Sequence, residues 1–488
     1  MTCGSPEHRE VARRRVSWLW LVIILAALAT VPRLFVGYGT DGDATRGAVA
    51  AQRLMHDGEY RPSRLPGYPL FEGLLALLVP WGGHAAANAF VLLAYVLMVW
   101  AFYRLGDGRE NQLMLTGLLA LTPIILVNAA STMDYAPGLS MMVCAYLAAN
   151  RERIGLSALL TALAVAFRLS NALFVIPLGL FFLLKGRRWP QVAGCAAVAV
   201  MGGLLFYTPV LMRYGLRMFS IPASKIDTVS YVLKGGYNLL ALFGLIATVV
   251  MFVAILSNLP RVVFVTRRAL KERDPGFAAE VTTVVLFLGL FICHSDEAAY
   301  LLPIIPWLYL LLARWLPSRQ LGVMMVVIAA ASLLTVEMKG GISGRRRIGF
   351  RPAWGYVVQD YLVRRELGRL REGLNRFDRS DKAVVMTGMG PALTFRNPVL
   401  SPVPSATISP ELAGESNALW HRIDDRDVYL THSVSIKGCA VLRRLGYDLY
   451  MFSEAAPSAI QIVYHYDPYK AGIRPVEIMT PHAFYRQR

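Results

Sequence analysis

Cysteine is scarce in this sequence and is not arranged for disulfide or zinc chemistry. The chain of 488 residues contains five cysteines, and none of them forms a C-x-x-C pair. They are Cys3, Cys144, Cys195, Cys293 and Cys439. Neither a disulfide framework nor a structural zinc site is therefore predicted. Internal repeats of roughly 20–50 residues and low-complexity tracts are also missing, which argues against a repeat architecture.

Acidic residues are few, with 32 Asp and Glu against 50 Lys and Arg, so the formal net charge is +18. An excess of this size can serve nucleic-acid binding, but none of the corresponding sequence motifs is present. Basic residues that flank membrane helices explain the excess without a polyanionic partner. We therefore predict membrane lipids, and no nucleic acid, as partners.

Apolar residues are abundant. They make up 55% of the chain, and the mean hydropathy is +0.46, which exceeds what soluble domains show. Several runs reach the about 20 apolar residues needed to cross a bilayer. The first run, residues 16–36, follows three arginines and has no small-residue cleavage site, so we interpret it as an uncleaved first span. The composition predicts a multi-pass protein of the plasma (inner) membrane.

Eleven apolar runs are candidate spans. They lie near residues 17–36, 85–103, 112–130, 135–149, 154–168, 171–184, 190–211, 237–257, 277–293, 299–313 and 320–336. A further run, residues 68–80, is too short for a full crossing and contains Pro69 and Glu72. Its status decides on which side every later loop lies.

The distribution of basic residues resolves that choice, because cytoplasmic loops are enriched in Lys and Arg. If residues 68–80 do not cross and the N-terminus is cytoplasmic, the cytoplasmic loops hold 18 basic residues and the outer loops hold 10. If they cross, the numbers become 9 and 19. Residues 68–80 are therefore predicted to form an interfacial helix on the outer side, in the first outer loop.

The tail after residue 337 is less apolar and is predicted to be a separate extracytoplasmic domain, residues 338–488, with residues 1–337 forming the membrane domain. We expect a linker at 340–351, an amphipathic helix at 360–377 and a helix at 436–445. Strands are expected at 382–387, 427–431, 447–452 and 460–466. Alternation of strands and helices indicates a small soluble α/β domain. Gly388 and Gly390 form a G-x-G, which indicates phosphate binding only weakly and is more typical of a turn that ends a strand.

An acidic motif follows the first span. Asp41 and Asp43 form a D-x-D, which can share a divalent cation such as Mg²⁺ or Mn²⁺. One of them can instead act as a general base, or Asp43 can simply cap the helix expected from residue 44. Arg46 lies one turn after Asp43, which suits a base beside a phosphate clamp and equally suits a plain salt bridge.

Four further polar residues are predicted to lie on the outer face. Arg64 suits a lipid phosphate at headgroup depth or simple snorkelling. Asp134, between two apolar runs, is a functional candidate or a helix cap. Arg168 can hold a phosphate or mark a turn. His294 can shuttle protons or bind phosphate, or it can be a solvated loop histidine.

These motifs and their order resemble the GT-C superfamily of membrane glycosyltransferases. The lipid A aminoarabinose transferases carry an Asp-x-Thr-Arg motif that opens an amphipathic helix, and residues 43–46 (DATR) match it. Residues 64–68 (RLPGY) match the basic turn that follows in that family, and residues 134–137 (DYAP) match a later acidic motif loosely. The protein O-mannosyltransferases are similar in arrangement. The resemblance implies a polytopic all-α membrane bundle of about eleven spans with interfacial helices in the first outer loop.

The resemblance also implies a reaction. A sugar on a polyprenyl phosphate would be the donor, Asp43 would deprotonate an acceptor hydroxyl, and attack at the anomeric carbon would invert its configuration. Asp134 would assist, and Arg46, Arg64 and Arg168 would neutralise the departing phosphate, where negative charge develops. The acceptor would be a lipid, a glycan or a protein. Asp41 is not required by the family motif, so a metal at Asp41 and Asp43 stays open.

Other functions place different demands on the sequence. A transporter or flippase for lipid-linked glycans commonly has internal repeats and polar groups near the midplane, whereas here the polar groups gather at one face. A ligase for lipid-linked oligosaccharides shares the same chemistry and is not separated by sequence. A non-catalytic scaffold leaves Asp43, Arg46 and Asp134 without a role.

Overall fold

In the computed structural model of the chain, the described residues are 6–58, 60–107, 110–219, 235–236, 238–240, 242–293, 298–339, 349–375, 382–386, 400–412, 420–423, 427–431, 436–452, 473–479 and 482–487. The chain divides into two compact units. The first, here called the membrane unit, comprises Met1–Phe35 and Ala50–Asp360, and the second, the tail unit, comprises Val36–Val49 and Tyr361–Arg488. Two helices, α2 (Gly42–Asp57) and α17 (Tyr356–Asn375), contribute residues to both units.

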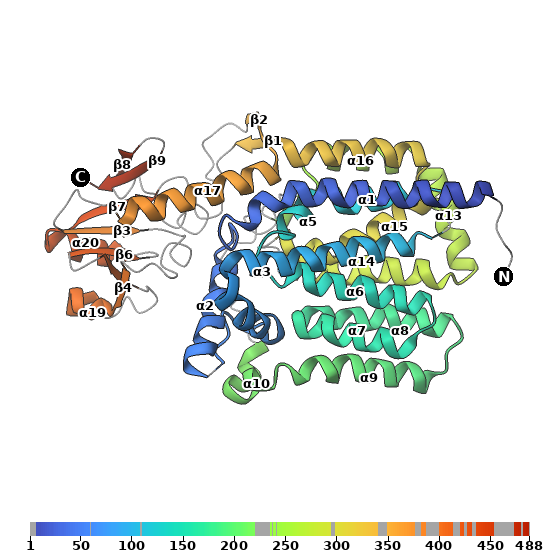
Figure 1. Cartoon of the computed structure of the whole chain (residues 1–488), viewed down its shortest axis with the longest axis horizontal. Helices are drawn as coiled ribbons and strands as arrows, with labels where there is room; N and C mark the ends of the chain where they lie inside the picture. Colours follow the sequence, from blue (N-terminus) through green and yellow to red (C-terminus); the bar gives the residue numbers. More distant parts are fainter. Residues whose placement is uncertain are drawn as a thin grey trace. The chain divides into compact units, whose positions relative to one another are not determined.

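The membrane unit consists almost entirely of helices, many of which run side by side (Figure 1). They are α1 (Pro6–Leu34), α3 (Pro69–Leu105), α4 (Gln112–Leu121), α5 (Pro123–Asn128), α6 (Tyr135–Asn150), α7 (Ile154–Phe167), η1 (Leu169–Phe174), α8 (Val175–Leu184), α9 (Trp189–Leu205), α10 (Thr208–Tyr214), η2 (Gly215–Phe219), α12 (Leu245–Ser257), α13 (Leu259–Lys271), α14 (Pro275–Cys293), η3 (Ala298–Ile304), α15 (Ile305–Trp315) and α16 (Ser318–Leu333). A short hairpin, β1 (Leu334–Lys339) and β2 (Gly349–Trp354), follows α16.

Several helices are long and apolar enough to cross a membrane. Among the described residues, Pro69–Leu105, Pro275–Cys293 and Ala298–Trp315 meet this condition by length and composition. Two bent pairs, α9 with Thr208–Phe219 and α12 with α13, meet it if each pair counts as one span. The chain is thus a multi-pass helical membrane protein, whereas the number of eleven spans stays a prediction.

The backbone of α3 breaks at Gly83, which has φ 56° and ψ −137° inside the helix. Only glycine adopts this conformation readily, so residue 83 separates a first helix from a second, longer one. The first of the two begins at Pro69, whose missing N–H suits a helix N-terminus. This division agrees with the predicted short helix at 68–80, and its interfacial position stays a prediction.

Buried polar side chains connect helices that are distant in sequence. Arg33, near the end of α1, pairs with Asp360 of α17 at 3.0 Å and donates to the carbonyl of Leu126 in α5 at 2.8 Å. Asn88 of α3 donates to the carbonyl of Leu34 and accepts from the Thr132 hydroxyl at 2.7 Å. These bonds hold the C-terminal ends of α1 and α5, the middle of α3 and the 129–134 turn together.

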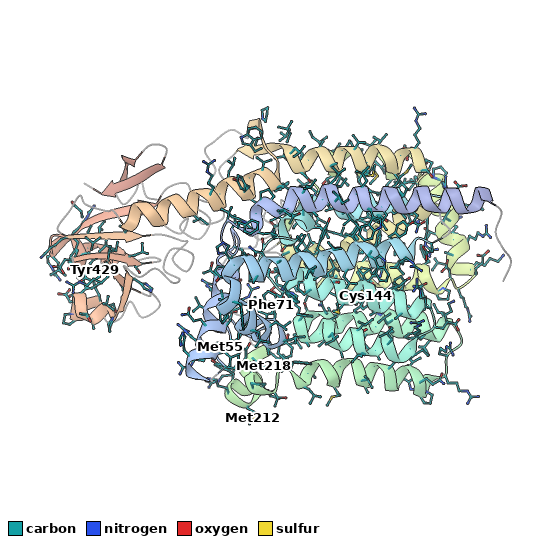
Figure 2. All side chains as sticks on the ribbon, viewed as in Figure 1. Met55, Phe71, Cys144, Met212, Met218 and Tyr429 are labelled. Carbon is teal, nitrogen blue, oxygen red and sulfur yellow. The ribbon has the colours of Figure 1, made fainter. Side chains whose placement is uncertain are left out.

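The tail unit contains a seven-stranded mixed sheet with the order β4-β5-β6-β3-β7-β9-β8. The strands are β3 (Lys382–Met386), β4 (Leu400–Val403), β5 (Trp420–Ile423), β6 (Asp427–Thr431), β7 (Asp448–Phe452), β8 (Ile473–Met479) and β9 (His482–Gln487). Strand β3 runs parallel to β6 and β7, and the other pairs are antiparallel. Ala383, Val384 and Val385 are all buried, as expected of a central strand covered on both faces. Helix α20 (Ile436–Arg444) contributes Leu442 to the core around Trp420 and Tyr429. Tyr429 is labelled in Figure 2.

Most elements predicted in the tail are confirmed. Strands β3, β6 and β7 and helices α17 and α20 form where the sequence indicates them. The expected linker is partly wrong, because residues 349–351 pair with β1 as the start of β2. Gly388, Gly390 and the expected strand at 460–466 lie outside the described residues. The domain boundary at residue 337 and the soluble character of the tail stay predictions.

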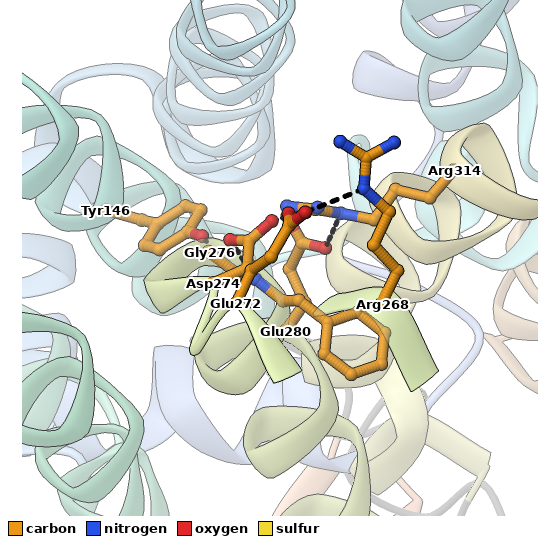
Figure 3. A network of polar contacts seen from close by, with 8 residues as sticks. Tyr146, Arg268, Glu272, Asp274, Gly276, Glu280 and Arg314 are labelled. Atoms are coloured by element: carbon orange, nitrogen blue, oxygen red, sulfur yellow. Dashed lines mark hydrogen bonds and ion pairs between the residues drawn. The ribbon is translucent and has the colours of Figure 1, made fainter. Parts of the chain in front are cut away.

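A second polar network joins α13, α14 and α15 (Figure 3). Arg314 of α15 bonds both carboxylate oxygens of Glu280, at 2.7 and 3.2 Å, and Asp274 at 2.7 Å. Asp274 also accepts the backbone N–H of Phe277 at 3.0 Å, so it caps the start of α14. Partial burial by itself raises the pKa of Asp274, but the Phe277 N–H and the Arg314 guanidinium lower it below its ordinary value. Glu280 is 1% exposed, so its ion pair with Arg314 is shielded from solvent on the carboxylate side.

Replacement of Arg314 is therefore expected to destabilise the membrane unit strongly. Arg314→Gln leaves the buried Glu280 carboxylate without its cation, which costs about 3–5 kcal/mol. Thermal unfolding of the purified protein in detergent measures the effect. Arg268→Gln is the matched control, because the Arg268–Glu272 pair is exposed on both sides and is expected to change the melting temperature little. Equal melting temperatures for the two variants would contradict this role of Arg314.

Candidate functional site

The acidic motif opens helix α2. The Asp41 carboxylate accepts the backbone N–H of Asp43 at 2.9 Å, so Asp41, and not Asp43, caps the helix that begins at Gly42. Asp43 lies in the first turn, where the helix dipole favours a negative charge. Its Oδ1 pairs with Nη1 of Arg46 at 3.0 Å, and its side chain is 11% exposed against 47% for Arg46. The helix cap thus accounts for Asp41, and Asp43 faces a cation.

The predicted metal pair has other partners in this arrangement. One oxygen of Asp41 accepts a backbone N–H and one oxygen of Asp43 pairs with Arg46. Within the described part of the chain, no group of three or more His, Cys, Asp and Glu side chains could hold a metal ion. A divalent cation at Asp41 and Asp43 would need most of its oxygen ligands from water or substrate. The metal at Asp41 and Asp43 stays a prediction.

A buried ion pair joins two turns of the membrane unit. Nη1 of Arg168 lies 2.8 Å from Oδ2 of Asp134, and the two side chains are 6% and 3% exposed. Asp134 occupies the N-cap position of α6 but makes no side-chain cap bond, and Arg168 ends α7 in an extended conformation. The carboxylate of Asp134 therefore pairs with Arg168 and does not cap α6. The helix-cap interpretation does not account for the position of this side chain.

Three tyrosine rings surround the Arg168 guanidinium. Its central carbon lies 4.1 Å from the ring centre of Tyr135, 4.9 Å from that of Tyr300 and 5.7 Å from that of Tyr68. Aromatic faces attract a cation most strongly where water is excluded. The rings and Asp134 together hold Arg168 in one orientation at the end of α7.

Arg64 joins this cluster through Tyr68. Its Nε donates to the Tyr68 hydroxyl at 2.8 Å, and its guanidinium lies 5.2 Å from the centre of the same ring. Burial raises the pKa of Tyr68, against the opposing effect of Arg168, so the hydroxyl stays neutral. Arg64, Tyr68, Asp134 and Arg168 are thus contiguous, and we refer to them as the arginine cluster.

Glu72 is a buried carboxylate beside this cluster that the sequence analysis did not select. It is 1% exposed and accepts hydrogen bonds from the Tyr60 hydroxyl and, at 3.1 Å, from the Ser63 N–H. Burial, and then the Glu72 carboxylate, raise the pKa of Tyr60, so Tyr60 remains the donor. The available signal was an acid inside an apolar run, which is a candidate by default.

The turn that carries Arg64 is tightly built. Gly67 has φ 86°, and a Cβ atom there would lie 2.8 Å from the Pro62 Cβ and 3.0 Å from the Tyr60 hydroxyl. Tyr60 also packs against the cluster of Tyr207, Val210 and Met218 from α10 and its flanks. Packing and Glu72 therefore determine the path of residues 60–68, and with it the position of Arg64.

The predicted site residues fall into two sets. Arg64, Asp134 and Arg168 meet in the membrane unit, whereas Asp41, Asp43 and Arg46 belong to the tail unit. His294 lies outside the described residues. Each set contains one carboxylate that is paired with an arginine, Asp134 with Arg168 and Asp43 with Arg46.

Comparison with solved structures establishes the fold. The chain resembles ArnT from Cupriavidus metallidurans bound to undecaprenyl phosphate and the same protein in the apo state. For each, the TM-score is 0.53 and the sequence identity 12%, and the match covers 97% of this chain and 98% of that chain. No protein-family model and no curated protein matches the sequence.

ArnT is a lipid A aminoarabinose transferase with the GT-C glycosyltransferase fold. The resemblance to GT-C membrane glycosyltransferases that the motifs indicate is thus confirmed for the fold, along nearly the whole chain.

Removal of the Glu72 carboxylate is expected to loosen the turn of residues 60–68. Glu72→Ala leaves the Tyr60 hydroxyl and the Ser63 N–H without their acceptor, which costs about 1–3 kcal/mol. Thermal unfolding in detergent and limited proteolysis of the 58–66 region measure the loss. Glu110→Ala, which removes an exposed loop carboxylate, serves as the control. Unchanged proteolysis of Glu72→Ala would show that packing alone holds the turn.

The Asp134–Arg168 pair is expected to behave as a coupled unit. Arg168→Met leaves a buried carboxylate and should cost about 3–5 kcal/mol, whereas the double variant with Asp134→Leu should recover part of that loss. Unfolding free energies of wild type, both single variants and the double variant give the coupling energy. Additive losses would show that the two side chains do not depend on each other.

Proposed function

We propose that this chain is an integral-membrane glycosyltransferase that transfers a sugar from a polyprenyl-phosphate-linked donor to an acceptor hydroxyl at the extracytoplasmic face. The observation that carries the proposal is the buried arginine cluster in a chain whose fold follows that of ArnT, a protein solved with undecaprenyl phosphate bound. The DATR sequence at residues 43–46 supports it independently of the fold.

The donor phosphate is proposed to bind at Arg64 and Arg168, with His294 as a further contact. A guanidinium carries five N–H donors in a planar fork, and one of those on Arg168 donates to Asp134. Asp134 would thereby orient Arg168 for a phosphate without competing for all of its donors. A prenyl chain can approach from the lipid side, where Met212 of α10 is 83% exposed (Figure 2). Met218, which follows in η2, packs with Tyr60 of the Arg64 turn.

The transfer is proposed to proceed by inversion. Asp43 takes the proton of the acceptor hydroxyl while that oxygen forms a bond to the anomeric carbon. The bond from this carbon to the phosphate oxygen breaks, and polyprenyl phosphate departs with the electron pair. Arg64 and Arg168 stabilise the negative charge on the leaving phosphate. Arg46 orients the Asp43 carboxylate, and Asp41 positions Asp43 through the helix cap.

The proposed topology follows from the charge distribution. The N-terminus lies in the cytoplasm, and the tail domain of residues 338–488 lies outside the membrane on the side of the active site. Acceptors of three classes, lipid, glycan and protein, share the hydroxyl chemistry that Asp43 serves.

Release of polyprenyl phosphate from a panel of polyprenyl-phosphate sugars tests the reaction in detergent. Asp43→Asn is expected to lower the rate by about 10²–10⁴-fold, the usual contribution of a general base. The variant keeps the position and shape of the side chain, so its melting temperature should match that of wild type. Release by Asp43→Asn at the wild-type rate would remove Asp43 as the base.

Asp41→Asn is the matched control, since Asn caps helices as well as Asp does. If Asp41 is only a cap, this variant and EDTA-treated wild type should both keep activity within about threefold, because the cap bond survives. Loss of activity in both would instead establish a metal held by Asp41 and Asp43. Absence of release with every donor would argue for the ligase or transporter alternatives.

A further inference from the structure

Helix α13 turns away from the preceding apolar helix. It is bent by 73° from α12, with which it is nearly continuous in sequence. Pro260 stands in its first turn, and proline cannot donate the backbone hydrogen bond that would extend α12. The side chain of Asn258 at the bend donates to the carbonyl of Ala254 at 2.8 Å and to the side chain of Gln320 in α16 at 2.7 Å. The bend is thus built into the sequence and anchored to a neighbouring helix.

Helix α12 presents a strip of large apolar side chains outward. Each of them is 51–60% exposed: Ile246, Val249, Phe252, Val253 and Leu256. In a membrane protein such a strip contacts lipid chains, so α12 lies along the hydrocarbon. A helix bent by 73° at its end therefore runs close to the plane of the membrane surface. Figure 1 shows α13 crossing the end of the bundle at which α1 begins.

The side chains of α13 are arranged for that position. Leu259, Val263 and Leu270 follow helical spacing on one side and are 48%, 39% and 65% exposed. Arg267 and Lys271, one turn apart and both exposed, lie next to this apolar strip. Arg261 and Arg268 continue the basic side, on which Phe264 is also 66% exposed, and Ala269 is buried against the protein. An apolar strip beside cations matches the boundary between acyl chains and headgroups.

The C-terminal end of α13 is also fixed by hydrogen bonds and an ion pair. The backbone N–H of Asp274 donates to the carbonyl of Ala269 at 2.9 Å, and the Asp274 carboxylate pairs with Arg314 (Figure 3). Glu272, the other acid of this turn, pairs with Arg268 at 2.8 Å. For Arg267 and Lys271, no ion pair is found among the described residues. Arg267 and Lys271 are therefore the exposed cations of α13 at this end that do not join these ion pairs, because the two nearest acids, Glu272 and Asp274, pair with Arg268 and Arg314.

We propose that α13 is a binding site for anionic lipid headgroups, with Arg267 and Lys271 holding the phosphate and the strip of Leu259, Val263 and Leu270 inserted among the acyl chains. A dissolved polyanion would pair with the cations but leave the apolar strip in water. An anionic lipid pairs with the cations through its headgroup and covers the apolar strip with its acyl chains. The site lies on the end of the bundle predicted to face the cytoplasm, and it is independent of the glycosyltransferase reaction.

The test uses the full chain in neutral detergent with added phosphatidylglycerol or phosphatidylcholine. Native mass spectrometry is expected to show at least about threefold more retained phosphatidylglycerol on wild type, because cations near a bilayer surface attract anionic lipid. The melting temperature should rise with phosphatidylglycerol only. High salt should reduce both effects, since exposed charges are screened.

Two double variants of the same helix make the test specific. Arg267→Gln with Lys271→Gln should lose the preference for phosphatidylglycerol, whereas Arg267→Lys with Lys271→Arg should keep it. Arg151→Gln with Arg153→Gln removes the same charge from another turn and should also keep it. Retention of phosphatidylglycerol by the first variant, or equal retention of both lipids by wild type, would overturn the proposal. Stabilisation by a short DNA duplex but not by phosphatidylglycerol would overturn it as well.

Discussion

A bilayer offers no hydrogen bonds to a polar group inside it, so each buried ionisable side chain of the membrane unit needs a partner from the protein. Arg168 with Asp134 and Arg314 with Glu280 satisfy this constraint between helices, and Arg33 with Asp360 does so between α1 and α17. Each pair joins segments that are distant in sequence. Because breaking a buried pair costs far more than an exposed pair contributes, these pairs act as fixed points that align the helix ends.

The two ends of the bundle satisfy this constraint with different partners. Arg314 has both of its carboxylate partners, Glu280 and Asp274, and completes a structural network. In the arginine cluster, by contrast, tyrosine rings provide much of the surroundings of Arg168. Asp134 pairs with one N–H group of Arg168, whereas the aromatic faces stabilise the cation without neutralising it, so N–H groups of the guanidinium remain for a phosphate. This difference in partners, more than the presence of arginine, supports a phosphate site at one end and an anchor at the other.

Proline and glycine convert a largely uniform apolar sequence into distinct helices. The chain changes direction after α12, where Pro260 begins α13, and the helical backbone of α3 breaks at Gly83. Pro260 is followed directly by Arg261, a charged residue that belongs outside the hydrocarbon. The resulting short helices are suited to the membrane surface, where the proposed donor and the proposed anionic lipid present their phosphates.

Sequence by itself determined the broad class of this protein. Long apolar runs predicted a multi-pass helical chain because a bilayer requires them, and the DATR and RLPGY motifs indicated the GT-C fold that the solved structures confirm. Local patterns also located β3, β6, β7 and α20 in the tail, since alternation and helical periodicity depend on near neighbours only. Asp41, Asp43, Arg46, Arg64, Asp134 and Arg168 were selected because charge is conspicuous among apolar residues.

Only the tertiary structure decided what those charges contact. Asp134 and Arg168 are 34 residues apart, and no periodicity relates them, so their pairing depends on how α6 and α7 pack. The importance of Glu72 was equally hidden, because its partners Tyr60 and Ser63 approach it through a turn shaped by Gly67. Asp41, and not Asp43, is the N-cap residue because the helix begins at Gly42 and not at the expected residue 44. The sequence shows which charged residues need a partner when they are buried. Packing between distant segments determines which residue that partner is.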